Sequence, residues 1–361
     1  MRNVAITRPG AMPGRGRPGR RIGAGAVAAG LVLFGGATAC SSAGASSSGG
    51  SGSTPSGTTS ASQTSVSDVT LNIGDQAGSG AEALLTAAGL INKLPFKAHW
   101  SDFTSGPPML QAMGSGSIDI GDVGDAPPVF AAAGGSQIAV VSALAANPGG
   151  SAILVPKSSP IHTVAQLRGK SIAVAQGSSS DYHLLATLTK FGLTIKDVTP
   201  DYLQPAEGQA AFASGHVAAW DVWSPFIEQA ESQDHARILI NGSDIGETYS
   251  FVVAAKAALG NPAKAAAIHD YLQLLGQAYA WAHSHQSAWA ATWAKATGLP
   301  ASVMSQAAQD SLSTPGPITP AVIASEQSVA NAFTSAGLIP SHVAFSNYAV
   351  TTFNSIFGGS S

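Results

Sequence analysis

The sequence predicts an α/β protein of two lobes joined by a double crossover and followed by a helical tail. Short apolar runs, turn residues and segments with helical spacing alternate along the chain, as strands, loops and helices do around a parallel sheet. Two further apolar runs, 152–156 and 248–254, accompany two such sets, and residues 262–357 have mostly helical spacing. Ligands of such sheets bind beyond the carboxyl ends of the strands, so we expect a site in the loops that follow strands.

The first 39 residues have the composition of an export signal. A basic region ends at Arg20 and Arg21, and no charged residue follows before Cys40. This stretch is rich in glycine and short for a membrane span, so we expect it to be removed. Residues 37–40 resemble the lipobox of bacterial lipoproteins, which implies that Cys40 is acylated. Ala37 stands where that pattern usually has leucine, and the alternative is an ordinary cleavage site.

A spacer follows the cysteine. Residues 41–67 are almost wholly Ser, Gly, Thr and Ala and carry no charge. Such a segment cannot bury enough apolar surface to order itself. We therefore predict that residues 40–68 are an acylated cysteine and a flexible linker that holds a folded body at a membrane surface.

The charge of the body excludes one class of partner. Six arginines precede the first acidic residue, Asp68, and without them the chain keeps 11 basic and 20 acidic residues, a net charge of −9 compared with −3 for the whole sequence. An acidic body argues against binding to nucleic acid. Cys40 is the one cysteine, so no disulfide within the chain stabilises the fold.

The first set of elements follows the spacer. Residues 69–73 alternate between apolar and polar, as a half-buried strand does, and Pro107 and Pro108 stand where a first helical turn tolerates proline. The predicted strands of this set are 69–73, 96–103, 117–123 and 138–143, and the predicted helices are 81–90, 109–113 and 129–133.

The second set has the same alternation. Its predicted strands are 171–175, 198–203 and 217–223, and its predicted helices are 164–167, 182–193 and 206–214. Between one strand and helix lies Gln176–Ser180, where a glycine allows a sharp turn and serines leave backbone N–H groups free at the first helical turn. Those donors and the helix dipole favour an anion, although the same serines also suit a simple helix cap.

Several of these loops resemble one family, the substrate-binding proteins of bacterial ABC importers for aliphatic sulfonates, nitrate and taurine. The segments that carry the resemblance are 103–113, 124–130, 152–157, 174–178, 211–215, 220–225 and 336–340. The resemblance implies a type II periplasmic-binding-protein fold, with lobe I at 69–153 and 252–361 and lobe II at 154–251. It also implies that 152–155 and 251–253 are the crossover strands, and that the chain is a monomer outside the cytoplasm that needs no cofactor or metal and delivers its ligand to an ABC permease.

By position, the resemblance also implies a set of ligand-binding residues. Gly177 to Ser179 would hold the sulfonate oxygens, and Gln76 and Asp125 would orient the other end from the facing lobe. Of Trp220 and Trp223, only one need line the cleft, because the two cannot point the same way on an ideal strand. The full set is Gln76, Asp125, Ala126, Gly177, Ser178, Ser179, Asp181, Tyr182, Trp220, Asp221, Trp223 and Glu247.

Each of the loops that follow predicted strands, at 74–80, 124–128, 176–181 and 219–225, contains an aspartate, whereas lysine and arginine are absent from them. A purely anionic ligand would face repulsion of about 1 kcal/mol from each nearby carboxylate at water-like screening. One hypothesis is therefore that the ligand carries a cationic or hydrogen-bond-donating part as well as, or instead of, a sulfonate, as a taurine-like zwitterion does. The alternative is that Asp75, Asp181 and Asp221 face water or cap helices.

Other classes of function have less support. The sequence has no Gly-x-Ser-x-Gly elbow, no His-Glu-x-x-His helix and no second cysteine, so we do not expect an enzyme. Trp281, Trp289 and Trp293 have the spacing of a packed helix face rather than a binding motif. Two alternatives stay open: a thiamine-pyrimidine-like ligand, and a ligand-sensing partner of a membrane receptor.

Overall fold

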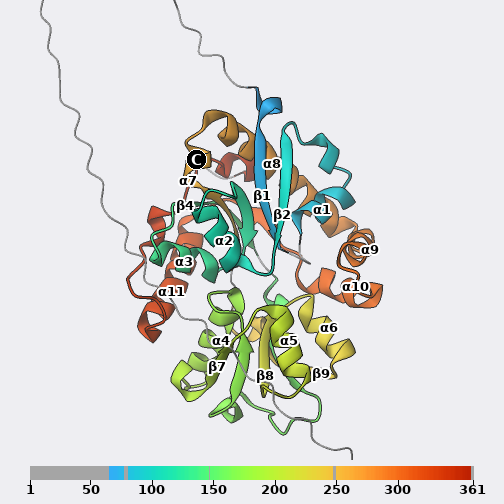
Figure 1. The fold of residues 1–361 in the computed structure, drawn as a ribbon, viewed down its shortest axis with the longest axis vertical. Helices are drawn as coiled ribbons and strands as arrows, with labels where there is room; N and C mark the ends of the chain where they lie inside the picture. The colour runs from blue at the N-terminus through green and yellow to red at the C-terminus, as the bar shows by residue number, and fades with distance from the viewer. Residues whose placement is uncertain (1–64, 77–79, 146, 247–248, 359–361) are drawn as a thin grey trace, which may run out of the picture. The chain divides into compact units, whose positions relative to one another are not determined.

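The computed structural model describes residues 65–76, 80–145, 147–246 and 249–358, so the export signal, Cys40 and most of the spacer lie outside the described residues. The described residues form two α/β lobes, each built on one β-sheet (Figure 1). The first lobe contains the six-stranded sheet, and the second lobe, within 151–246, contains the five-stranded sheet. A short 3₁₀ turn at Val66–Asp68 precedes the first strand, and Val66 already packs against the core.

The strands are β1 Thr70–Gln76, β2 Lys97–Phe103, β3 Ile120–Val123, β4 Ile138–Ala145, β5 Ser151–Pro156, β6 Ser171–Val174, β7 Thr199–Tyr202, β8 Ala219–Trp223, β9 Ala236–Asn241, β10 Tyr249–Ala255 and β11 Thr314–Gly316. The α-helices are α1 Ala81–Ala87, α2 Gly106–Gly114, α3 Ala126–Ala133, α4 Ser179–Lys190, α5 Pro205–Ala213, α6 Phe226–Gln233, α7 Lys256–Leu259, α8 Pro262–Ser284, α9 Gln286–Thr297, α10 Ala301–Asp310 and α11 Pro320–Ala336. The helix predicted at 164–167 is a 3₁₀ helix.

The two sheets share one plan. The strand order is β11-β4-β10-β3-β1-β2 in the first lobe and β7-β6-β8-β5-β9 in the second. In each sheet three neighbouring strands are parallel, β2-β1-β3 and β7-β6-β8, and one inserted strand, β10 or β5, runs antiparallel to both of its neighbours. The sheets are therefore mixed rather than wholly parallel, because the strand that arrives from the other lobe enters in the opposite direction.

The chain passes between the lobes just before each inserted strand. The runs 152–155 and 251–253, expected to cross, each lie within a single sheet, and the boundary expected after residue 153 falls inside β5. The two connecting segments contact each other closely, since a Cβ atom on Gly242 would lie 2.2 Å from the carbonyl oxygen of Pro148. Glycine, which lacks a Cβ atom, therefore allows the two connecting segments to lie this close together.

The helical tail packs on both lobes. Helix α8 contacts β1 and α1, and α9 contacts α1, which places the stacked Trp289 and Trp293 in the core of the first lobe. Helix α10 contacts α6 of the second lobe, and α11 contacts α3 and α4. The tail therefore helps to fix the distance between the lobes. Within the described part of the chain, no helix combines the length and apolar character needed to cross a bilayer.

Direct hydrogen bonds also join the lobes. The hydroxyls of Thr104 and Ser105, which follow β2, both donate to Oε1 of Gln204 at the start of α5, at 2.8 Å. The carboxyl ends of the parallel strands of both sheets thus meet across one gap, which is the position expected for a ligand.

Candidate functional site

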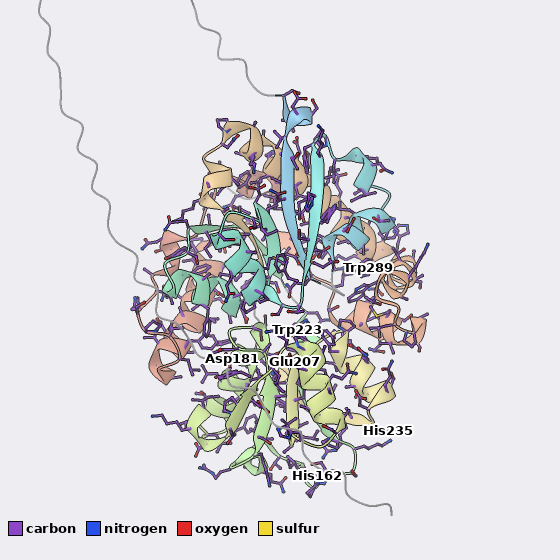
Figure 2. The ribbon with its side chains drawn as sticks, in the orientation of Figure 1. His162, Asp181, Glu207, Trp223, His235 and Trp289 are labelled. Carbon is purple, nitrogen blue, oxygen red and sulfur yellow. The ribbon has the colours of Figure 1, made fainter. Side chains whose placement is uncertain are left out.

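A cavity of about 180 Å³ lies between the lobes and is lined by both. Half of the twelve residues expected from the sequence line it: Gln76, Asp125, Ser178, Ser179, Tyr182 and Trp223. In Figure 2, Trp223 lies where the second lobe meets the first, and Trp289 lies in the first lobe. Glu247 lies outside the described residues.

The start of α4 brings backbone donors to the cavity. Gly177 precedes the helix with a positive φ of 68°, a conformation that glycine adopts at little cost. The Gly177 N–H donates to Oδ2 of Asp181 at 2.8 Å, and the Ser178 N–H donates to the carbonyl of Ala175 at 3.1 Å. Within the described part of the chain, the N–H groups of Ser179 and Ser180 have no acceptor. These two donors, at the positive end of the helix dipole, are free for an anion.

The hydroxyl of Ser178 serves the turn rather than the cavity. Its Oγ donates to the carbonyl of Ala175 at 2.6 Å and thereby fixes the entry into α4. Asp181, whose burial raises its pKa to about 6, holds the Gly177 amide from within the first helical turn. Gly177 and Asp181 therefore hold the turn at the start of α4, and neither lines the cavity.

Asp125 faces α4 from the first lobe. Its Oδ1 accepts the Ala126 N–H at 2.7 Å, so it caps α3. Burial raises the pKa of Asp125 to about 7, despite hydrogen bonds from Ala126 and Ser179 that lower it. The adjacent Gly124 lies so near the second lobe that a Cβ atom there would be 1.6 Å from Oγ of Ser179. The two lobes are in contact at this point.

A second group of polar residues lies at the end of β1 and β3. Gln76 Nε2 donates to the carbonyl of Asp122 at 3.0 Å, and both residues line the cavity. Asp75 accepts the N–H groups of Gln76, Ala81 and Glu82 at 2.8 to 3.1 Å, and so caps α1 as the simpler hypothesis expected. Burial and the charge of Asp122 raise the pKa of Asp75 to about 7.

The structure distinguishes the two tryptophans of β8. Trp220 is only 1% exposed and packs between Phe212 and Phe226 in the core of the second lobe. Trp223 lines the cavity and meets Phe226 edge to face, with ring centroids 6.0 Å apart. The tryptophan that faces the ligand space is therefore Trp223.

Asp221 forms a buried pair instead of facing the cavity. Nδ1 of His183 lies 2.9 Å from its Oδ2. Burial opposes the charged imidazole, but the Asp221 carboxylate outweighs it and raises the pKa of His183. Of the two, His183 lines the cavity. Among the described residues, no group of three or more His, Cys, Asp or Glu side chains could hold a metal ion.

Several residues of the cavity wall had no signal in the sequence analysis. Asp122 lies in a short strand, and Tyr279, Trp289 and Trp293 belong to helices more than 150 positions away along the chain. The two tryptophans are core residues, as their spacing predicts, but they also form part of the cavity wall. Their helical spacing identifies a packed face and cannot show that the face ends at a cavity.

Known proteins share this fold and much of the sequence. A family model described as "ABC transporter, phosphonate, periplasmic substrate-binding protein" matches residues 92–298. The chain is 38% identical to an Escherichia coli protein named for binding aliphatic sulfonates. The 276 aligned residues cover 76% of this chain and 86% of that protein.

Two solved structures extend the likeness to three dimensions. The alkanesulfonate-binding protein SsuA of Xanthomonas axonopodis pv. citri, bound to MOPS, matches with a TM-score of 0.73 and 33% identity, over 78% of this chain and 98% of that one. The aliphatic sulphonate binding protein SsuA of Escherichia coli matches with a TM-score of 0.69 and 36% identity, over 77% and 91%. These matches confirm the predicted fold class.

Proposed function

Because the chain belongs to the periplasmic substrate-binding proteins of ABC transporters, we propose that it captures a small organic sulfonate between its lobes and delivers it to an ABC permease. The family consists of solute-binding proteins rather than enzymes. The observation that carries the ligand proposal is the free N–H group of Ser179, which lines the cavity at the start of α4, followed by the free N–H group of Ser180 in the same helical turn. They suit the oxygens of a tetrahedral anionic head group.

The charge around the cavity favours a sulfonate over a phosphonate. No lysine or arginine occurs among the described residues that line it, whereas Asp122 and Asp125 do. A sulfonate carries one negative charge. A phosphonate, like a phosphate, loses a second proton near neutral pH and then carries two negative charges. The second charge would have to be held by neutral donors beside carboxylates, which is unfavourable in a partly buried site.

Calorimetry with pentane-1-sulfonate and pentylphosphonate at pH 8 tests this proposal. We expect one sulfonate to bind per chain and the phosphonate to bind at least about tenfold more weakly, since one additional unfavourable charge contact of ~1.4 kcal/mol has that effect. Equal or tighter binding of the phosphonate would reverse the choice of ligand class. If neither compound binds, the anion site at α4 is wrong.

We further propose that the ligand favours a closed arrangement of the lobes, which the permease then recognises. The hydrogen bonds from Thr104 and Ser105 to Gln204, and the contact of Gly124 with Ser179, join the lobes beside the cavity. A ligand that touches both lobes adds to these contacts and shifts the population. Small-angle scattering should show a smaller radius of gyration with pentane-1-sulfonate, and an unchanged radius would contradict closure.

The N-terminal sequence supports a proposal for the position of the chain in the cell. We propose that Cys40 is acylated and tethers a monomer to the outer face of the cell membrane, which supports capture of ligand next to the permease. Metabolic labelling with a radioactive fatty acid should mark the natural chain but not Cys40→Ala, and the variant should be released from membranes. Membrane retention of unlabelled Cys40→Ala would exclude this anchor.

A further inference from the structure

Helix α11 packs against both lobes at once. Buried apolar residues of α11, of α3 in the first lobe and of α4 in the second form one cluster, which we call the three-helix seam. Within it, the ring of Phe333 on α11 meets Phe130 of α3 and Tyr182 of α4, with ring centroids 4.8 and 6.0 Å apart. Because α3 and α4 belong to different lobes, the seam can be complete only while the lobes stay together.

One carboxyl group is buried on the face of α11 that forms this seam. Glu326 is three residues before Val329 and seven before Phe333, so the three side chains share one face of the helix, and Glu326 is only 1% exposed. Its Oε1 is buried and has no hydrogen-bond partner among the described residues. Buried polar groups are nearly always paired, and an ionised carboxylate without water or donors is far more costly than a neutral carboxyl group. The seam therefore favours Glu326 in its neutral form.

The groups that face Glu326 are acidic or neutral. Burial, and after it the charge of Asp125 at the start of α3, raise the pKa of Glu326 well above its ordinary value of 4.5. Burial and the charges of these two carboxyl groups raise the pKa of Tyr182 on α4 to about 12, so its hydroxyl is neutral. The 3₁₀ turn Phe345–Asn347, which also contacts α11, contains no titratable side chain, and the hydroxyl of Tyr348 beside it donates to a backbone carbonyl of α3.

Cations on these three helices do not balance a charge on Glu326 either. Helices α3 and α11 contain no lysine or arginine, and Lys190, in the last turn of α4, donates to the carbonyl of Asp244. The imidazole of His183 on α4 is paired with Asp221, and Asp181 on the same helix is another acid. A proton is therefore the cation that can neutralise Glu326 in the seam.

We propose that Glu326 is a proton-binding site that couples the contact between the lobes to pH: the three-helix seam closes around the neutral carboxyl group and loosens when Glu326 loses its proton. Ionisation would leave a charge among apolar side chains and near Asp125. Water can reach and solvate that charge when α4 moves away from α11. This inference goes beyond the proposed function, because it concerns the chain without any ligand.

The direction of the effect follows from the two states of Glu326. Once the seam has opened, water surrounds the carboxyl group and its pKa returns towards 4.5, whereas in the closed seam the pKa is raised. The stabilisation of the seam by the proton is therefore complete below about pH 4.5 and is lost as the pH rises through the raised pKa. Between these two values, closing the seam takes up a proton.

Carbon-13 NMR of the mature chain, labelled at the glutamate side-chain carboxyl groups, tests the proton site. The sequence contains six glutamates, so Glu326→Gln, which removes one signal, assigns the signal of Glu326. We expect this signal to titrate with a midpoint well above 4.5. A midpoint near 4.5 would overturn the proposal. A signal that does not titrate before the chain unfolds would also overturn it, because the seam then does not open on its own.

Small-angle scattering without ligand, recorded below and above that midpoint, tests the coupling to the lobes. We expect the radius of gyration of the natural chain to increase above the midpoint, and we expect Glu326→Gln to lose this increase. Glu326→Met, which replaces the carboxyl group by an apolar group of similar size, should also lose it and serves if Glu326→Gln folds poorly. Asp270→Asn, which removes a carboxyl group on α8 outside the seam, is the control and should expand as the natural chain does.

Two results of the scattering would contradict the coupling. One is a radius of the natural chain that is the same on both sides of the midpoint. The other is an expansion of the Glu326 variants equal to that of the natural chain. Neither the NMR nor the scattering sample contains a sulfonate, so failure of this inference leaves the proposed ligand untouched.

Discussion

The two ends of the cavity differ in the kind of group that each lobe contributes. The second lobe contributes the backbone N–H group of Ser179 at the start of α4, whose partial positive charge needs no ionised side chain. The first lobe contributes Asp122 and an aromatic wall. The partial charge of a backbone N–H group does not depend on pH, whereas the ionisation of a buried carboxyl group depends on pH and on its surroundings. The donors at the start of α4 are thus fixed by the fold, whereas the charge of the first-lobe carboxyl groups depends on pH.

The largest expected effect concerns a first-lobe carboxyl that faces the anion end. Burial raises the pKa of Asp125 to about 7, so the folded protein binds a proton that the unfolded chain has lost above its ordinary pKa of 3.8. Its contribution to the free energy of unfolding is full below about pH 4 and is lost as the pH rises to about 7. Asp125→Asn keeps an acceptor for Ala126 and should be more stable than the natural protein at pH 8, by roughly 2–4 kcal/mol.

Urea unfolding at pH 4.5 and pH 8 measures the effect of Asp125→Asn. The gain should be small at the lower pH and large at the higher one, and Asp270→Asn should give no such difference. A variant that is less stable than the natural protein at pH 8 would mean that the ionised carboxylate stabilises the fold.

The donor at the anion end can be removed without breaking the helix. Ser179 is the first residue of α4, where proline is tolerated, and Ser178 has the extended conformation that precedes proline well, with φ −89° and ψ 173°. Ser179→Pro lacks the N–H and should weaken sulfonate binding about hundredfold, as the loss of a hydrogen bond to a charged group predicts.

Ser179→Ala is the control for this change, because it lacks the hydroxyl but keeps the N–H. Calorimetry should show a much smaller loss for the alanine variant than for the proline variant. Equal losses would assign the role to the hydroxyl, and circular dichroism would verify that α4 is intact in both.

The contact between the two lobes can be altered at Gly124. A Cβ atom there would lie 1.6 Å from Oγ and 3.0 Å from Cβ of Ser179, so Gly124→Ala requires Ser179 to rotate or the lobes to separate slightly. We expect binding of every sulfonate to weaken about tenfold by calorimetry, with no change in preference between ligands. Gly114→Ala, where the nearest atom is 3.5 Å away, is the control. A change in preference would mean that Gly124 acts on one end only.

The smallest effect separates the two tryptophans of β8. Trp223→Phe should weaken ligand binding about threefold, through lost contact area at the cavity, with little change in stability. Trp220→Phe should leave affinity unchanged and lower the free energy of unfolding by about 1–2 kcal/mol, since it leaves a void between Phe212 and Phe226. Calorimetry and urea unfolding on both variants test this, and the reverse result would exchange the assignments.

Local sequence patterns were sufficient for most elements and for the turn at the start of α4. The alternation at 69–73 and the apolar run at 171–175 correspond to β1 and β6, and the Gln176–Ser180 turn leads into α4 as predicted. Strand β9 and helix α6 were missed, because neither has a clean apolar period: β9 alternates irregularly, and α6 carries two glutamates and two glutamines. A helix start is a local feature, so its free N–H groups can be inferred from a few consecutive residues.

The other end of the cavity depends on contacts between distant residues. Asp122 and Trp293 are separated by more than 150 positions, and only the packing of α8 and α9 on the first lobe brings them to one wall. The same holds for Trp220 and Trp223, because strand alternation places them on opposite faces without showing which face is covered by α5 and α6. The sequence by itself determined most of the elements and the turn that leads into α4, since these follow from short-range periodicity and turn chemistry. The tertiary structure decided which side chains share the cavity, because that depends on which faces the fold buries against each other.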